Sequence, residues 1–273
     1  KLQIDKYKEE AEKIVRSVAS EKWTALNLYR LFLYAETLKH GKDIACEQTP
    51  RNLFYLKEIL KVYPQAMVVA MVRDPRSVLL SQKNKWKIRS YGAKNIPIFE
   101  VVRTWINYHP FTISWFWQAA ANVIENFSKN PRVKVVRFED LISNPEHVVQ
   151  DVCRFIGISF NKSMLNVSQG EGGVSSLKPV VNSHITGIDK SAVDTWKRGG
   201  VSLTEIFLCQ KIARQGMEQY SYSSINAWAG WMPVAGQVII YPFHLVLATL
   251  ANLFRAKSIA SAVKRRLIML WMS

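Results

Sequence analysis

The most informative pattern along the chain is a short apolar run followed at once by a charged turn. Residues 66–72 read AMVVAMV, and turn-forming residues stand at both ends. Such a short, partly β-branched run is typical of a strand buried on both faces of a parallel sheet. It leads into Asp74, a favoured N-cap, and Pro75, which suits a first helical position. The pattern therefore predicts a buried strand at 65–72, a tight loop and a helix.

The rest of the chain alternates helical spacing with one further strand. Pro110 is expected to divide a long aromatic-rich helix, and Gly157 to end a helix capped by Asn144 and Pro145. A strand, helix, strand order favours an α/β fold with a central parallel sheet flanked by helices. Helices are predicted at residues 7–39, 51–62, 99–127, 145–156 and 202–217, and a second strand at 133–138. Loops are predicted at 83–98, at 139–144 before the helix that starts at Pro145, and at 160–190.

The C-terminal part has a different pattern. Residues 219–254 contain no Lys, Arg, Asp or Glu, a run longer than the ~20 residues that span a bilayer, although Pro233 and Pro242 are expected to interrupt it. A true span, an interfacial or re-entrant helix, and a dimerisation surface all fit. A span would place the following basic tail and the domain on opposite sides, so an interfacial anchor is favoured. We therefore divide the chain into an α/β domain, 1–224, and a membrane-interacting helical segment, 225–273.

The amino-acid composition limits the classes of partner that the protein is expected to bind. The 273 residues carry a formal net charge of +16, which indicates an anionic partner: nucleic acid, anionic lipid, a nucleotide or an acidic substrate. No RNP, KH or zinc signature supports a nucleic-acid partner. Three scattered cysteines, Cys46, Cys153 and Cys209, have neither zinc-site nor disulfide spacing.

The turn after residues 66–72 is a candidate anion site. A helix N-terminus offers amides and a partial positive charge, and Arg73 could add a bidentate contact to a phosphate. Ser81 lies about two helical turns further on and could reach the same anion. The alternative is an ordinary strand-to-helix turn with solvated arginines.

Four segments in register resemble the sulfotransferase superfamily. Residues 57–81, KEILKVYPQAMVVAMVRDPRSVLLS, resemble its 3′-phosphate-binding segment, and residues 45–52, ACEQTPRN, resemble the E-K-T-P segment that precedes it. Residues 136–158 resemble its R-Y-E-D-L segment, and residues 182–200 resemble its N-S-S…W-(K/R) segment. The resemblance covers about residues 41–222 and implies a P-loop-like fold.

The resemblance implies a cofactor and the residues that hold it. The cofactor would be 3′-phosphoadenylyl sulfate, without a metal, and Arg73 and Ser81 would hold its 3′-phosphate. Phe138 takes the position of a Tyr near the adenine and lacks the hydroxyl. Near the nucleotide on the closing segment would lie Ser183, Trp196, Lys197 and Arg198; a core anchor is the equal alternative for Trp196.

Glu47 is the candidate general base that takes the proton of the acceptor hydroxyl. Gln48 replaces the Lys that usually follows it, which removes a cation from the expected site. The alternative is a carboxylate near a helix start before Pro50.

The superfamily's second phosphate loop, G-x-x-(K/R)-S-G-(T/S), has no match. Residues 1–40 contain no Gly. We therefore expect a truncation that leaves the first strand and the 5′-phosphosulfate loop upstream of Lys1, and an inactive or impaired fragment.

The predicted function is sulfuryl transfer to a hydroxyl of a glycan, lipid or small metabolite. Residues 83–89 alternate Lys and Arg with Trp86 and other residues, and they suit a loop that binds an acidic acceptor. The alternatives are a P-loop kinase-like phosphotransferase, whose Walker lysine is not seen, and a non-catalytic, membrane-associated nucleotide-binding relative. The expected location is a membrane surface, with the catalytic domain in the cytoplasm, or in the Golgi lumen of a eukaryote.

Overall fold

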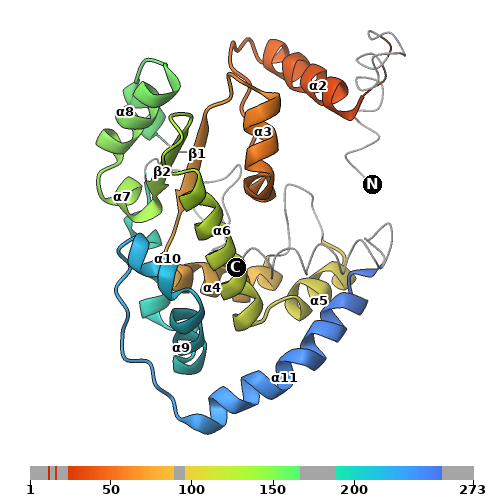
Figure 1. The fold of residues 1–273 in the computed structure, drawn as a ribbon, viewed down its shortest axis with the longest axis vertical. Helices are drawn as coiled ribbons and strands as arrows, with labels where there is room; N and C mark the ends of the chain where they lie inside the picture. The colour runs from red at the N-terminus through yellow and green to blue at the C-terminus, as the bar shows by residue number, and fades with distance from the viewer. Residues whose placement is uncertain (1–11, 13–15, 17–23, 89–95, 167–187, 254–273) are drawn as a thin grey trace. The chain divides into compact units, whose positions relative to one another are not determined.

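A computed structural model describes residues 12, 16, 24–88, 96–166 and 188–253 (Figure 1). The chain divides into two compact units, residues 1–52 and 53–273. In the first unit, helix α2 (Ala25–Lys39) begins where Thr24 is extended and its side chain accepts the Asn27 amide at 3.1 Å. This cap means that the helix expected over 7–39 does not run unbroken, because a threonine that satisfies the first amides starts a new helix.

The second unit is built on two parallel strands. Strand β1 (Val68–Val72) pairs with β2 (Val133–Arg137) in a register that places Val68 opposite Val133 and Val72 opposite Arg137. The two predicted strands and their parallel pairing are thus observed, each within a few residues of its expected ends. The long connection between them contains α4, α5 and α6 (Figure 1).

The two faces of strand β1 differ in burial. Ala70 and Val72 of β1 pack with Trp117, Met217 and other buried side chains of α6 and α10. On the opposite face, Val69 and Met71 are 38% and 50% exposed. The prediction of a strand buried on both faces is therefore wrong for β1, which alternates buried residues on the face of Ala70 and Val72 with exposed residues on the other face.

For the remaining helices, the ends marked by Pro and Gly were predicted better than the helix lengths. Pro110 starts α6 and separates it from α5, as expected, and Gly157 ends α8 in the left-handed conformation with φ 77°. Residues 138–143 form a short helix, α7, rather than the predicted loop, and the helix expected over 202–217 is divided at Ala213. The bounds are η3 (Pro50–Tyr55), α3 (Leu56–Val62), α4 (Pro75–Asn84), η4 (Lys85–Lys87), α5 (Ile98–Ile106), α6 (Pro110–Asn126), α7 (Phe138–Ser143), α8 (Pro145–Ile156), η5 (Lys162–Leu165), η6 (Lys190–Ala192), η7 (Thr195–Arg198), α9 (Leu203–Ile212) and α10 (Arg214–Gln219).

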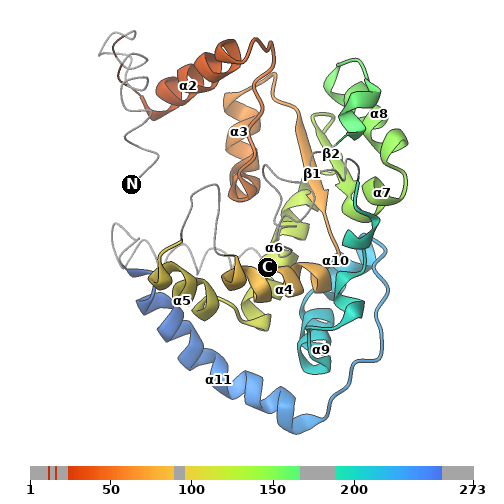
Figure 2. The same ribbon diagram turned by 180° about the vertical axis from the view of Figure 1, so that it is seen from behind.

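The C-terminal helix α11 (Trp231–Leu250) is continuous, in contrast to the predicted interruption by two prolines. Pro233 falls in the first turn, where its missing N–H costs nothing, and Pro242 lies within the helix on its exposed side. The helix has 20 residues and is long and apolar enough to cross a membrane, by length and composition only. Seen from behind, it runs alongside α5 (Figure 2).

Candidate nucleotide site at the start of helix α4

The turn between β1 and α4 is held by Asp74. Its carboxylate caps the helix by accepting the Arg76 amide at 2.8 Å, and Pro75 occupies the first helical position. Asp74 is 3% exposed, so a charge is buried here together with the start of the helix. The predicted N-cap is therefore confirmed.

Arg76 is buried, not solvated. Its guanidinium makes two hydrogen bonds to the Asp74 carboxylate, at 3.0 and 2.7 Å, and donates to Gln210 Oε1 and to the Ser223 carbonyl. It also lies 4.0 Å above the ring centroid of Trp196, a cation–π contact. With these partners satisfied, Arg76 ties α4 to α9 and to the segment before α11, and it has a structural role rather than a ligand-binding one.

A second carboxylate, Glu139, approaches the same helix start from α7. Its Oε1 accepts the Asp74 amide at 3.0 Å, and its Oε2 accepts the Tyr222 hydroxyl at 2.8 Å. Burial, and then this hydrogen bond, raise the pKa of Tyr222. Two amides at the turn, those of Asp74 and Arg76, are thus used by the protein's own carboxylates. The expectation that this turn offers free amides to an anion is wrong for these two.

Arg73 stands between β1 and the Asp74 cap and is partly buried. Its guanidinium lies 4.5 Å from the ring centroid of Phe138 and donates to the Ala192 carbonyl at 2.8 Å, while its own carbonyl accepts from Trp117 Nε1. Its Nε is buried and makes no hydrogen bond to the residues that the structure describes. Burial is the main cause that lowers the pKa of Arg73. A buried donor of this kind fits an anionic ligand oxygen.

Three other residues were expected to lie near the cofactor: Ser81, Trp196 and Ser183. Ser81 is on α4, partly exposed, two turns after the cap. Trp196 is 4% exposed and packs with Ile206 and Ala227, which is the position expected of a residue that anchors the core. Ser183 lies outside the described residues.

Lys197 and Arg198 are exposed on η7. Lys197 pairs with Asp194 at 2.6 Å, and Arg198 donates to the Ser191 carbonyl. Their segment contacts the turn before α4 through Ala192 and Arg73, and the first turn of α4 through Trp196 and Arg76.

Glu47 belongs to the first unit, before η3. Its exposed carboxylate accepts a hydrogen bond from the Asn52 side-chain amide. Within the described residues, no three His, Cys, Asp or Glu side chains gather as a metal site would require. Metal-free chemistry therefore stays a prediction.

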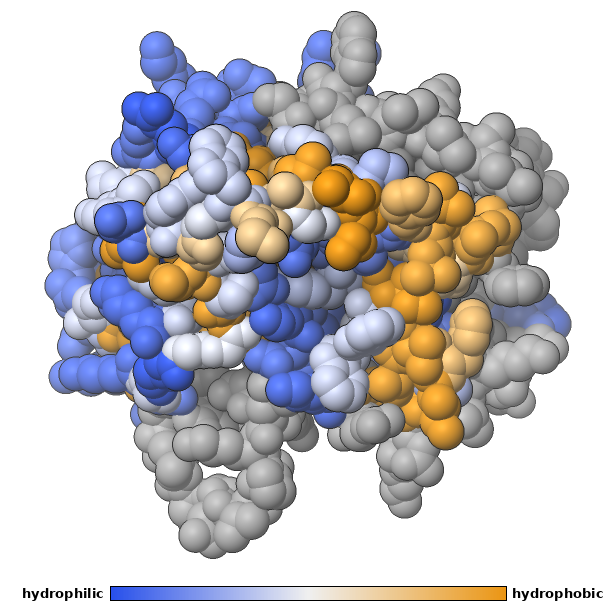
Figure 3. All heavy atoms as spheres, turned by 90° about the horizontal axis from the view of Figure 1, so that it is seen from below, coloured by the Kyte–Doolittle hydropathy of each residue, from blue (hydrophilic) through white to orange (hydrophobic). Residues whose placement is uncertain are grey.

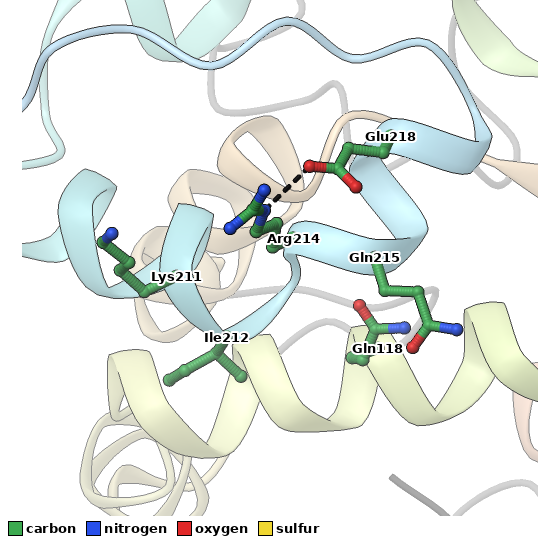
Figure 4. Close-up of a pocket in the computed structure, with 6 residues that line it drawn as sticks. All are labelled: Gln118, Lys211, Ile212, Arg214, Gln215 and Glu218. Carbon is green, nitrogen blue, oxygen red and sulfur yellow. Dashed lines mark hydrogen bonds and ion pairs between the residues drawn. The ribbon is translucent and has the colours of Figure 1, made fainter.

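A surface hollow of about 410 Å³ lies elsewhere, between α6, α9 and α10 (Figure 4). Arg214 and Glu218 pair across one side of it at 2.8 Å, and Gln118 lies at its floor, where Oε1 accepts the Gly216 amide. None of the predicted site residues lines this hollow, which therefore gives no support to an alternative nucleotide site.

Sequence reasoning missed three contributors to the site: Glu139, Tyr222 and Trp117. Each acts through the backbone or a buried charge at the turn. The only available signal was the acidic residue directly after the second strand, because strand ends of one parallel sheet lie at the same edge.

Comparison with known proteins identifies the class. The family model described as "Sulfotransferase family" matches residues 3–162, more than half of the chain. The chain therefore belongs to the sulfotransferase family.

Individual relatives are more distant. Protein-tyrosine sulfotransferase 1 of Danio rerio is 22% identical over 205 residues, which are 74% of this chain and 47% of that protein. The chain thus spans about half the length of this curated relative. Two solved structures are also similar: the sulfotransferase domain from the curacin biosynthetic pathway (21% identity, 65% of this chain and 60% of that chain, TM-score 0.38) and the sulfotransferase domain from the Synechococcus PCC 7002 olefin synthase (16%, 81% and 81%, 0.49). At these TM-scores, neither likeness supports an argument about the site.

Proposed function

We propose that this chain belongs to an enzyme that transfers a sulfuryl group from 3′-phosphoadenylyl sulfate to a hydroxyl group. The observation that carries the proposal is the environment of Arg73, a cation at the end of β1 with a buried Nε that has no protein partner among the described residues. Family membership supplies the class of reaction, and this site supports a phosphate-bearing nucleotide as the donor.

Side chains, rather than the α4 amides, would hold the 3′-phosphate. Arg73 and Ser81 both project from the β1–α4 segment, whereas Glu139 and Asp74 already accept from two amides of the turn. Phe138 would stack on the adenine with the ring face that Arg73 leaves open. Lys197 and Arg198, now bound to Asp194 and the Ser191 carbonyl, would offset the charge of the leaving nucleotide phosphate.

Glu47 is proposed as the general base. An alcohol is a weak nucleophile until its proton is removed in the transition state, and a carboxylate within hydrogen-bond reach can take that proton. The accepting oxygen of Glu47 is already presented to a donor, the Asn52 amide. The acceptor class is a hydroxyl of a glycan, lipid or small metabolite, and the name of the Danio rerio relative adds the tyrosine hydroxyl of a protein to the candidates.

Calorimetry with two nucleotides tests the phosphate site. Adenosine 3′,5′-bisphosphate should bind the chain more tightly than adenosine 5′-monophosphate, and Arg73→Ala should weaken the bisphosphate about 10- to 100-fold while it changes the monophosphate little. The matched control is Arg154→Ala, which removes an arginine whose side chain is 78% exposed. Absence of a bisphosphate preference, or an equal loss in both variants, would refute the site.

Turnover tests the base separately. Glu47→Gln should reduce sulfuryl transfer about 100-fold and leave bisphosphate affinity unchanged. Unchanged turnover would exclude Glu47 as the base. A chain that binds the bisphosphate but transfers nothing to any hydroxyl acceptor would favour the non-catalytic nucleotide-binding relative.

A further inference from the structure

Helix α11 turns its polar side chains inward. The Tyr241 ring packs against Phe111 and Trp115, with centroids 5.1 and 5.6 Å away, and its hydroxyl accepts from Thr112 at 3.4 Å. The His244 ring lies 4.7 Å from that of His109 at the start of α6. The middle of α11 is therefore held to α6 by aromatic and polar contacts.

The C-terminal end of the helix is held by hydrogen bonds to α5. Asn252, just past Leu250, accepts from Arg103 at 2.9 Å and donates to Asn107 Oδ1 at 2.7 Å. Since Arg103 also pairs with Glu100 at 2.6 Å, these groups form one polar network between α5 and α11. The helix is thus attached at its middle and at its end.

The opposite side of α11 is apolar and exposed. Phe243 is 74% exposed and Ile239 is 65% exposed, although either side chain would be expected in a core. A helix of a water-soluble domain has the reverse arrangement. The outer face of α11 consists of Trp231, Met232, Val238, Ile239, Ile240, Phe243, Val246, Leu247 and Leu250, all of them exposed.

The neighbouring helix α5 shows the same inversion. Its Arg103 and Glu100 are largely buried, whereas Ile98 is 76% and Trp105 59% exposed. Both ribbon views place α5 beside α11 (Figures 1 and 2). Seen from below, apolar side chains gather in a continuous orange band on the molecule (Figure 3). A patch of this kind marks an interaction surface.

The charges around the outer face match an anionic lipid bilayer. Residues 219–254 contain no Lys, Arg, Asp or Glu, so no fixed charge on the outer face of α11 opposes its insertion into lipid. Exposed Lys85 and Lys87 of η4 adjoin α5, and the sequence after α11 supplies Arg255, Lys257 and Lys264–Arg266. Apolar residues flanked by cations, with Trp at the boundary, suit a helix that lies among lipid headgroups.

We propose that the outer face of α11 rests in the surface of an anionic lipid bilayer, with the helix parallel to the membrane plane. A spanning arrangement would detach Tyr241, His244 and Asn252 from α5 and α6 and place their polar groups in hydrocarbon. The interfacial arrangement keeps every one of these contacts. This inference does not depend on the catalytic proposal.

Vesicle co-sedimentation with the full chain tests lipid binding. Vesicles of phosphatidylcholine with phosphatidylserine should bind the protein, and vesicles of phosphatidylcholine alone should bind it more weakly. The double variant Ile239→Glu/Phe243→Glu should partition at least about tenfold more weakly, because two apolar side chains lose their burial in lipid and two charges are added. The matched control Tyr55→Glu changes another exposed apolar residue, on η3, and should bind as the wild type does.

Two results would overturn lipid binding. One is a wild-type chain that stays in the supernatant with both kinds of vesicle. The other is a chain that sediments in the ultracentrifuge as a dimer and becomes monomeric in the double variant while its vesicle binding is unchanged, since the face would then bind a second copy.

Cysteine labelling distinguishes an interfacial helix from a spanning one. Ala229→Cys and Ala251→Cys mark the two ends of α11, which is about 30 Å long, at positions outside the outer face, on a Cys46→Ser background that removes the exposed native thiol. When the protein is added to sealed vesicles, a membrane-impermeant maleimide in the outer solution should label both ends. If one end reacts only after detergent is added, the helix spans and the interfacial arrangement is wrong.

Discussion

The start of α4 and the outer face of α11 are both unusual in which side chains they bury, and they are unusual in opposite ways. At the α4 start, charged residues are inside: Asp74 and Arg76 are each 3% exposed. On α11, apolar residues are outside, with Phe243 at 74% exposure. At the α4 start, the cost of burying charge is offset within the chain, because each buried charge has a charged or polar partner.

The difference indicates where each region obtains its stabilisation. A buried ion pair is tolerated only when its hydrogen bonds are complete, and Arg76 meets this condition through Asp74, Gln210 and Ser223. The side chains of the α11 outer face stay exposed among the described residues, although Trp231 contacts the Trp228 ring, and we expect their burial to come from another surface. Variants that disturb one region and not the other can therefore test this contrast.

The largest expected effect is at Arg76. Arg76→Met keeps most of the side-chain volume but leaves Asp74 buried without its cation, which should lower the free energy of unfolding by about 3–5 kcal/mol. Urea unfolding should show a lower midpoint with an unchanged m-value. The counterpart, Phe243→Ser, should change stability little in the absence of lipid, because that side chain is already exposed. An equal loss in both variants would show that the α11 outer face is buried against protein in solution.

Local signals predicted the fold best where one residue determines the backbone. Asp74, Pro110 and Gly157 marked the start of α4, the division of the long helix and the end of α8, and each is observed. These signals act within one turn of the chain, so they can be read without tertiary contacts. The burial of β1 was predicted wrongly because it depends on which helices pack on each sheet face, and an apolar run does not contain that information.

The candidate site was only partly predictable for the same reason. Arg73 was found from its place after a strand, but the sequence could not show that Glu139 and Asp74 accept from two amides at the turn. Nor could it show that Arg76 is buried over Trp196, a residue 120 positions away. Such long-range contacts decide which of two neighbouring arginines, Arg73 or Arg76, can face a ligand.

His109 gives the second largest expected effect and tests the inner side of α11. Its Nδ1 accepts the Phe111 amide at 3.3 Å, and its ring faces Tyr241 and His244. Burial, and then His244, lower the pKa of His109 to about 4, against some attraction from Glu205. Because this pKa lies below its ordinary value of 6.5, the unfolded chain binds the proton first as the pH falls.

The neutral His109 should therefore contribute its full share to the free energy of unfolding above pH 6.5. That free energy should decrease by up to about 3 kcal/mol as the pH falls toward 4. Urea unfolding at a series of pH values would measure this slope, and His109→Gln should flatten it over that interval. Below pH 4.5 a separate loss is expected from Glu205. Burial raises the pKa of that carboxyl, but hydrogen bonds from Lys83, Tyr108 and Ser202 outweigh burial and lower it overall. Parallel pH curves for the wild type and His109→Gln would contradict the buried neutral histidine.

The smallest expected effect compares a methyl group added on α10, against the Trp117 that donates to the turn before α4, with a methyl group added on α11. In Gly216→Ala, the new Cβ would lie 2.6 Å from Trp117 Cζ3 and 2.8 Å from Ala121 Cβ. Trp117 is buried and donates to the Arg73 carbonyl, so it cannot move aside freely. The free energy of unfolding of Gly216→Ala should therefore be lower than that of the wild type by about 1–3 kcal/mol. Gly236 of α11 has no atom within 4 Å of such a Cβ, and Gly236→Ala should stabilise the helix by about 0.5–1 kcal/mol. Thermal unfolding of both variants would give the two shifts in opposite directions. A destabilised Gly236→Ala would mean that α11 is closely packed at this position in solution, and the contrast between a closed α4 site and an open α11 surface would then fail.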